Sequence, residues 1–335
     1  MQKTHFIGTD VSKQTLDFSV CYQGKIIYRQ QVSNTKPAVK QLFSSFKNLP
    51  GFQLGNALCC MEHTGIYNNI LLESLLETGC DICVEPALRI KQSQGMTRGK
   101  NDSVDADRIA QYAYIQRDHL KLWSPEKTEI KKLKHLIAMH SRLTHSMAQL
   151  ATPVKENKNF IDKSLAKLEE KAFRSTLNVM KKDLKNIEKM IDILIEEHES
   201  LGKPYKLLTS IPGIGKITAI NLLAVSSGFE NFESPKQFAC YAGIAPFKHE
   251  SGSSIRGRTR VSHLANKKIK TLLHLAAMAA IKAQGELQQY YKRKVAEGKN
   301  RMSVLNAVRN KLIHIAFSVI KRQTPYEKKY LPTLA

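Results

Sequence analysis

The sequence predicts an α/β domain followed by a mainly α-helical region, and three observations support this division. Short apolar, strand-like segments alternate with helical segments over residues 1–118. From residue 130 onward, apolar residues recur instead at helical spacing. Between the two patterns lies Trp123-Ser124-Pro125, where proline and the residue before it disfavour a continuous helix. We therefore expect a first domain over residues 1–122.

The order of elements in this first domain is informative. Three strands are predicted near residues 4–10, 15–22 and 25–33, with Gly24 in the turn between the second and the third. A helix, a strand, a helix, a strand and a final helix follow, near residues 36–48, 57–62, 67–78, 81–85 and from about 102. Three strands followed by strand–helix units are the order of a ribonuclease H-like fold.

Composition favours a polyanionic partner. The 335-residue chain carries 52 Lys and Arg against 29 Asp and Glu, which gives a formal charge of +23 and a pI near 9.7. Nucleic acid or an anionic membrane surface would both suit this charge. Membrane binding is disfavoured, because no apolar run approaches the ~20 residues that span a bilayer and no signal pattern begins the chain. We expect a cytoplasmic protein with no membrane partner.

The six cysteines do not suggest a disulfide framework. They fall mostly on apolar strand-like segments, which suits reduced thiols in a core. Cys80 and Cys83 form a lone CxxC motif, and without a second pair or suitably spaced histidines it is a poor zinc site. Both cysteines are therefore predicted to be structural.

The helix that starts near residue 102 gathers acids in a basic neighbourhood. Asp102 and Asp105 stand three residues apart and therefore share one helix face. Paired carboxylates suit a divalent cation such as Mg²⁺, and nearby cations would suit a phosphodiester. These cations are Lys91, Arg98, Lys100 and Arg108. The alternative is an ordinary helix N-terminus, where acids offset the helix dipole.

Two strand ends carry further acids. Asp10 closes the first apolar strand, and Glu62 closes the apolar run that begins at Ala57. A buried carboxylate needs a partner. If the two strands lie side by side and the acidic helix crosses their ends, Asp10 and Glu62 would converge with Asp102 and Asp105 on one metal site.

Several motifs resemble those of the DEDD-type insertion-sequence transposases, a group that includes the Piv-type DNA invertases. The segments that carry the resemblance are Gly-Thr-Asp-Val-Ser-Lys (8–13), Met-Glu-His-Thr-Gly-Ile-Tyr (61–67), Asn-Asp-Ser-Val-Asp-Ala (101–106), Ile-Pro-Gly-Ile-Gly (211–215), Glu-Ser-Gly-Ser-Ser (250–254) and Arg-Val-Ser-His (260–263). They occur in the family's order, and the resemblance covers nearly the whole chain. The resemblance implies a RuvC-like catalytic domain over residues 1–122 and a C-terminal transposase domain.

This resemblance also implies cofactors and partners. Asp10, Glu62, Asp102 and Asp105 would bind Mg²⁺, with Mn²⁺ as an alternative. The partners would be DNA, as element ends and target, and a structured non-coding guide RNA from the element. Family members act as oligomers whose active site combines two protomers, so a homodimer or homotetramer is expected.

Residues 126–202 are expected to form a linker of long helices, broken near Thr152-Pro153. Along the second helix a heptad seam steps by three and four residues; its members are Leu177, Met180, Leu184, Ile187, Ile191 and Leu194. The seam would suit pairing with another copy of the chain, but packing within one chain gives the same pattern.

The C-terminal domain, residues 203–325, is expected to bind nucleic acid. Residues 207–219 resemble a helix-hairpin-helix, in which Gly213 and Gly215 would let backbone amides approach a phosphate; a hairpin that merely packs is the alternative. From Ser251 to Gly285 there are seven Lys or Arg and no acid. The phosphate-binding candidates are Arg256, Arg258, Arg260, Lys267 and Lys268, with Lys270 and His263 beside them. A helical stripe from Val304 to Val319 is predicted to pack on this domain.

The basic block also contains candidate nucleophiles, namely Ser251, Ser253, Ser254 and Ser262. A serine is a weak nucleophile unless a base, a metal or a cation field activates it. The family's Arg-hydrophobic-Ser-Lys-x-Gly-Asn pattern falls on residues 260–266, so the resemblance assigns the nucleophile role to Ser262. This chain has His263 and Ala265 where the family has lysine and glycine. Ser253 is the alternative nucleophile.

These observations favour a DNA transposase or site-specific recombinase with a DEDD metal site and a serine nucleophile. A metal-dependent nuclease resembling a Holliday-junction resolvase is the first alternative. A sugar-kinase-like phosphotransferase would also suit Gly8-Thr9-Asp10, but it lacks a glycine-rich adenosine-binding signature and suits a charge of +23 poorly. A non-catalytic nucleic-acid-binding protein is the remaining alternative.

Overall fold

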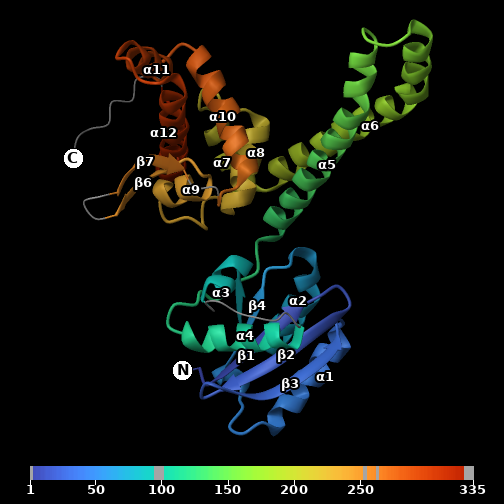
Figure 1. Ribbon diagram of the computed structural model, residues 1–335, viewed down its shortest axis with the longest axis vertical. Helices are drawn as coiled ribbons and strands as arrows, with labels where there is room; N and C mark the ends of the chain where they lie inside the picture. Colours follow the sequence, from blue (N-terminus) through green and yellow to red (C-terminus); the bar gives the residue numbers. More distant parts are fainter. Residues whose placement is uncertain (1–2, 94–101, 252–254, 262–263, 328–335) are drawn as a thin grey trace. The chain divides into compact units, whose positions relative to one another are not determined.

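The computed structural model describes residues 3–93, 102–251, 255–261 and 264–327, and at 102–103, 248–251 and 255–260 it describes the backbone alone. The chain forms two compact units, residues 1–125 and 126–335 (Figure 1). Each unit has its own hydrophobic core. No helix in the described ranges is long and apolar enough to cross a membrane.

A five-stranded mixed sheet forms the centre of the first unit. Its strands are β1 (His5–Val11), β2 (Thr15–Tyr22), β3 (Lys25–Ser33), β4 (Ala57–Glu62) and β5 (Asp81–Glu85), and they lie in the order β3-β2-β1-β4-β5. The first three pair antiparallel, whereas β4 pairs parallel to both β1 and β5. This is the predicted ribonuclease H-like arrangement, and the predicted fold class is confirmed.

Helices cover both faces of this sheet (Figure 1). On one face, α1 (Lys36–Ser45) and α2 (Asn69–Thr78) pack against alternate residues of the strands. On the other face lie α3 (Ala87–Ser93), which was not predicted, and α4 (Asp102–Ile115). The predicted helices were slightly too long, because short 3₁₀ turns at Phe46–Asn48 and Gly65–Asn68 occupy their expected ends.

The cysteines belong to these cores. Cys80 packs on the α1 and α2 face of the sheet and Cys83 on the α4 face, and both are buried, free thiols. Burial raises the pKa of the Cys80 thiol to about 12. The predicted structural role of this pair is confirmed.

The second unit begins with an antiparallel hairpin of two long helices, α5 (Thr128–Asn157) and α6 (Lys163–Glu197). The expected break near Thr152-Pro153 was wrong, because α5 continues through Pro153. The next residue, Val154, is buried in the second unit, and packing of this kind offsets the hydrogen bond that proline cannot donate. The chain turns instead at residues 158–162, where the Asp162 side chain accepts a hydrogen bond from the Ser164 amide at 2.7 Å.

The C-terminal half of the heptad seam packs within the chain. Ile187, Ile191 and Leu194 of α6 are buried in one core with Leu133 of α5 and with the helices that follow. The helices expected as a separate linker over 126–202 are therefore continuous with the second unit.

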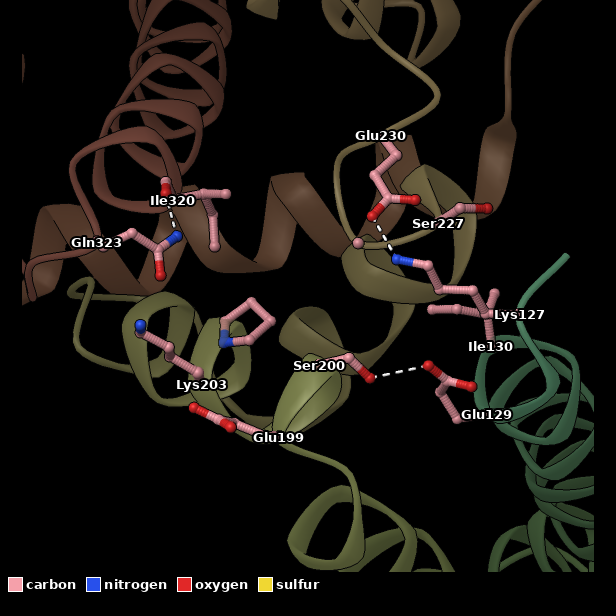
Figure 2. Close-up of a pocket in the computed structure, with 12 residues that line it drawn as sticks. Lys127, Glu129, Ile130, Glu199, Ser200, Lys203, Ser227, Glu230, Ile320 and Gln323 are labelled. Carbon is pink, nitrogen blue, oxygen red and sulfur yellow. Dashed lines mark hydrogen bonds and ion pairs between the residues drawn. The ribbon is translucent and has the colours of Figure 1, made fainter.

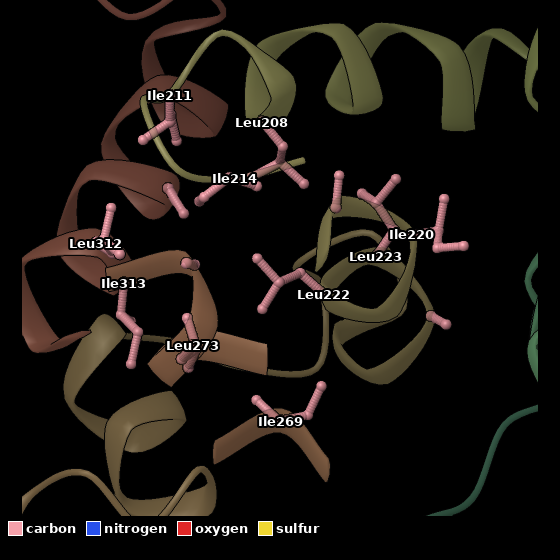
Figure 3. Close-up of a cluster of buried hydrophobic side chains, with 14 of the residues drawn as sticks. Leu208, Ile211, Ile214, Ile220, Leu222, Leu223, Ile269, Leu273, Leu312 and Ile313 are labelled. Carbon is pink, nitrogen blue, oxygen red and sulfur yellow. The ribbon is translucent and has the colours of Figure 1, made fainter. Parts of the chain in front are cut away.

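The remaining helices surround this shared core (Figure 3). They are α7 (Glu199–Thr209), α8 (Lys216–Ser226), α9 (Pro235–Tyr241), α10 (Lys267–Lys282), α11 (Glu286–Ala296) and α12 (Arg301–Arg322). Leu222 of α8, Leu273 of α10 and Leu312 of α12 point into it (Figure 3). The stripe from Val304 to Val319 is mostly buried, as predicted. Strands β6 (Pro246–Ser251) and β7 (Ile255–Val261) form a hairpin that was not predicted.

Candidate active site

Two of the predicted metal ligands lie at the ends of adjacent parallel strands. The register of β1 and β4 pairs Thr9 with Met61, and the next residues along the two strands are Asp10 and Glu62. Both acids are partly exposed. Because parallel strands present their carboxyl ends at one edge of a sheet, this register places Asp10 and Glu62 beside each other.

Helix α4 delivers the other two predicted ligands to the same edge. A Cβ on Gly8 would lie 2.3 Å from the carbonyl oxygen of Ala106 and 2.2 Å from the amide nitrogen of Ala110, so α4 packs directly on β1 at this point. Nearer the start of β1, Phe6 meets Tyr114 with ring centroids 5.6 Å apart. The helix therefore runs antiparallel to β1, and its first turn, with Asp102 and Asp105, lies toward Asp10.

The four predicted ligands come together in the positions of their backbones. Asp105 is partly exposed and forms an ion pair with Arg108 of its own helix at 2.8 Å. The Asp102 side chain lies outside the described residues. Among the side chains that the structure describes, no three His, Cys, Asp or Glu form a group that could hold a metal ion. The donor types and their placement fit a hard divalent cation, and the set requires Asp102.

Asp107 has a different environment from Asp105. Its carboxylate accepts hydrogen bonds from Arg29 at 2.8–3.0 Å and from the Ser19 hydroxyl, so it fastens α4 to β3 and β2. The same contact raises the pKa of the Arg29 guanidinium. Asp107 is thus engaged in packing α4 onto the sheet.

In the second unit, the predicted nucleophile Ser262 and its neighbour His263 lie outside the described residues, as does Ser253. The segment that follows is held by side-chain hydrogen bonds. Asn266 caps α10 by accepting a hydrogen bond from the Ile269 amide at 3.0 Å, and its side-chain amide donates to the Tyr241 hydroxyl at 2.8 Å. These bonds fix the chain four residues after Ser262.

The predicted phosphate-binding residues occupy two elements. Arg256, Arg258 and Arg260 take alternate positions along β7, and their side chains lie outside the described residues. Lys267 and Lys268 are exposed in the first turn of α10. The basic block is therefore a hairpin followed by a helix start, a shape that the sequence pattern did not reveal.

The two glycines of the helix-hairpin-helix have different surroundings. Gly213 has a φ of +91°, and a Cβ there would lie 2.3 Å from the carbonyl oxygen of Ala276 in α10, so its place is determined by packing. Gly215 is exposed, has open space around it and begins α8 without a side-chain cap. Of the two glycines, Gly215 is the one that lies in open space at a helix start, and phosphate binding by either glycine stays a prediction.

Two family models match the chain. A transposase model of the DEDD type matches residues 7–157, and the model described as Transposase IS116/IS110/IS902 family matches residues 205–292. The four predicted metal ligands lie in the first segment and Ser262 in the second. The chain belongs to the DEDD-type insertion-sequence transposases.

Relatives support the assignment. The pilin gene-inverting protein of Moraxella lacunata is 29% identical, over 98% of this transposase and 99% of that protein. The transposase for insertion sequence element IS1111A of Coxiella burnetii is 25% identical, over 97% and 92%. Among solved structures, Thermus thermophilus RuvC in complex with a Holliday junction substrate is 14% identical, over 36% of this chain and 99% of that one, with a TM-score of 0.26, and the assignment does not rest on it. The transposase is thus an enzyme that cleaves and joins DNA.

Two asparagines of the transposase that sequence reasoning missed support the strand ends. Asn68 is buried; its side chain donates to the Glu62 carbonyl at 2.7 Å and accepts from the Thr64 amide at 3.0 Å. Asn34 is also buried and donates to the carbonyls of Ser12 and Tyr67, at 3.0 and 3.1 Å. Their only sequence signal is the tendency of asparagine to bond nearby backbone.

A separate hollow of about 330 Å³ lies in the second unit of the transposase, between the start of α5, the start of α7 and the end of α12 (Figure 2). Its polar groups are largely paired with one another. Ser200 donates to Glu129 at 2.8 Å, and Lys127 forms an ion pair with Glu230 (Figure 2). These two pairs connect elements that are far apart in the sequence.

Proposed function

We propose that this transposase cleaves and joins DNA with two sets of residues, a metal site in the first unit and a serine nucleophile in the second. The observation that carries the proposal is the antiparallel packing of α4 on β1, which directs Asp102 and Asp105 toward the strand ends at Asp10 and Glu62. Those four residues would hold Mg²⁺, or Mn²⁺ in its place. The bound ion would stabilise the negative charge that develops on the attacked phosphate.

Ser262 would be the attacking group. Its hydroxyl oxygen would form a bond to the phosphorus as the bond from phosphorus to the leaving sugar oxygen breaks. The serine proton would leave and the sugar oxygen would gain one, so that the broken strand is held as a phosphoserine ester. No carboxylate lies between Ser251 and Gly285 to act as a base. Arg260 and Lys267 would neutralise the attacked phosphate, and formation of the ester would also require the metal site.

A suicide DNA substrate tests this mechanism on one denaturing gel. We expect the wild-type enzyme with Mg²⁺ to leave protein covalently joined to a strand, and Ser262→Ala to leave none. Ser253→Ala is the matched control and should retain the adduct. An adduct that is lost in Ser253→Ala and kept in Ser262→Ala would move the nucleophile. Cut DNA with no adduct would favour a resolvase-like nuclease that uses water.

A second copy of the chain is the proposed partner of the helical hairpin. At its tip Phe160 is 86% exposed, and Leu168 and Leu165 of α6 are 66% and 55% exposed. Apolar side chains gathered at such a tip suit burial against an identical tip. Light scattering should give a dimer or tetramer for the wild type, and Phe160→Ser with Leu168→Ser should shift the mass toward the monomer. An unchanged mass would place the oligomer contact elsewhere.

The proposed guide is a structured RNA. Support comes from the family resemblance, and the formal charge of +23 is compatible with an RNA partner. RNA that co-purifies with the enzyme should derive mainly from the non-coding part of its own element and should be required for cleavage. Full cleavage after ribonuclease treatment would reject the guide while leaving the metal and serine assignments intact.

A further inference from the structure

The metal ligands on β1 and β4 belong to a longer line of acids. The strand register pairs Asp10 with Asp17 of β2 and Glu62 with Glu85 of β5. With Asp10 beside Glu62, four carboxylates occupy neighbouring positions across four strands. We refer to Asp17, Asp10, Glu62 and Glu85 as the carboxylate row.

The row lies on the sheet face covered by α4. Residues two apart on a strand share a face, so Asp10 shares the face of Gly8, which contacts α4 directly. By the same rule Asp17 shares the face of Ser19, whose hydroxyl bonds to Asp107 of α4. Directly opposed residues on antiparallel strands have Cβ atoms about 5 Å apart, so Asp17 is a close neighbour of Asp10.

The two outer members of the row differ in how their charge is balanced. Glu85 is 3% exposed and forms an ion pair with Arg89 at 3.1 Å. Asp17 is 8% exposed, and its carboxylate oxygens both accept from the neutral amide of Gln31, at 3.1 Å each. Among the described side chains no Lys or Arg forms an ion pair with Asp17. A buried acid opposite a second acid and held by a neutral amide is stabilised by a cation at their shared edge.

We propose that Asp17 is a positioning residue of the metal site. It is not one of the four ligands; its charge strengthens the field that attracts the divalent cation to Asp10, and its bonds to Gln31 keep that charge in place. The inference rests on the proposed metal site. It also has a consequence without metal, because Asp17 and Asp10 then repel each other across the strands and lower the stability of the first unit.

The test measures Mn²⁺ affinity by calorimetry and melting temperature in the presence of EDTA, both on the full-length protein. Asp17→Asn should weaken Mn²⁺ binding by about tenfold, since a unit charge next to a divalent ion is lost. It should also raise the melting temperature in EDTA, because the repulsion is removed. Asp17→Glu keeps the charge and should bind Mn²⁺ within about threefold of the wild type.

Asp107→Asn is the matched control, since Asp107 contacts the same sheet face but balances Arg29. It should lower the melting temperature in EDTA and change Mn²⁺ affinity much less than Asp17→Asn does. If Asp17→Asn behaves like this control, or binds Mn²⁺ as the wild type does, the positioning role is wrong. Asp10→Asn separates the two proposals: if it too leaves Mn²⁺ binding unchanged, the metal site itself fails.

Discussion

The first unit of the transposase gathers negative charge and the second gathers positive charge, and they do so by different means. In the first, acids lie at fixed register positions at strand ends, and α4 is seated on the sheet by Gly8 and by the pair of Asp107 with Arg29. In the second, the acid-free stretch from Ser251 to Gly285 covers one strand of a hairpin, β7, and the whole of α10. Metal ligation requires closely defined positions, whereas attraction of a polyanion requires mainly charge density. Rigid strand ends suit the first task and a hairpin suits the second.

The largest expected effect distinguishes metal ligation from the attraction of DNA. Asp10→Ala or Asp105→Ala should reduce recombination at least about a thousandfold, because the metal would no longer stabilise charge on the phosphate. DNA affinity measured by filter binding should change little, since carboxylates do not attract the polyanion. Asp107→Ala should cost much less activity. Equal loss in Asp107→Ala would mean that the wrong face of α4 has been assigned to the metal.

A pair of glycines tests whether each unit depends on its own close packing. Gly8→Ala should destabilise the first unit by about 3 kcal/mol or more, because the added Cβ meets the backbone of α4 at 2.2 Å. Gly213→Ala should destabilise the second unit by a similar amount, since it meets α10 at 2.3 Å and also has a positive φ. Hydrogen exchange should rise only in the unit that carries the change. As a control, Gly51→Ala has open space and should cost about 1 kcal/mol.

The dependence of DNA affinity on salt concentration tests the arginines of the β6–β7 hairpin. Replacing both Arg256 and Arg258 with alanine should flatten the log–log dependence of DNA affinity on salt by about 2, uniformly across unrelated sequences. The control replaces Lys181 and Lys182, which are exposed on α6, and should leave the slope nearly unchanged. Equal slopes in the two double variants would mean that Arg256 and Arg258 lie on a solvated surface and do not contact phosphates.

The smallest expected effect is on the pH dependence of stability, and it applies to both units. Burial lowers the pKa of His5 in the first unit, and burial together with the nearby Arg309 lowers the pKa of His274 in the second. The unfolded chain then binds protons more readily, so stability should fall as pH drops below about 6.5 and continue to fall toward the lowered pKa. His274→Gln should weaken this loss in the second unit alone, measured by urea melts at pH 5 and 7. Identical pH dependence in variant and wild type would assign the effect to other groups.

Much of the first unit follows from the sequence because its signals are local. Apolar runs that end in Asp10 and Glu62 give both the strands and the acids, and the three-strand order limits the topology. The expected break at Pro153 failed because the sequence rule weighs only the lost hydrogen bond, whereas α5 packs against α6 and the next residue, Val154, is buried. The hairpin of β6 and β7 was missed because its strands are polar and lack a clear apolar alternation.

The sequence by itself determined the order of the five strands in the first unit, the acids at the strand ends and the acid-free basic block, because periodicity, spacing and charge are properties of the chain. Only the tertiary structure decided the direction of α4 over β1, the pairing of Asp107 with Arg29, the packing role of Gly213 and the position of Asp17 opposite Asp10. The physical reason is that each of these depends on contacts between residues far apart in the sequence. Such contacts form only when strand register and helix packing are fixed together.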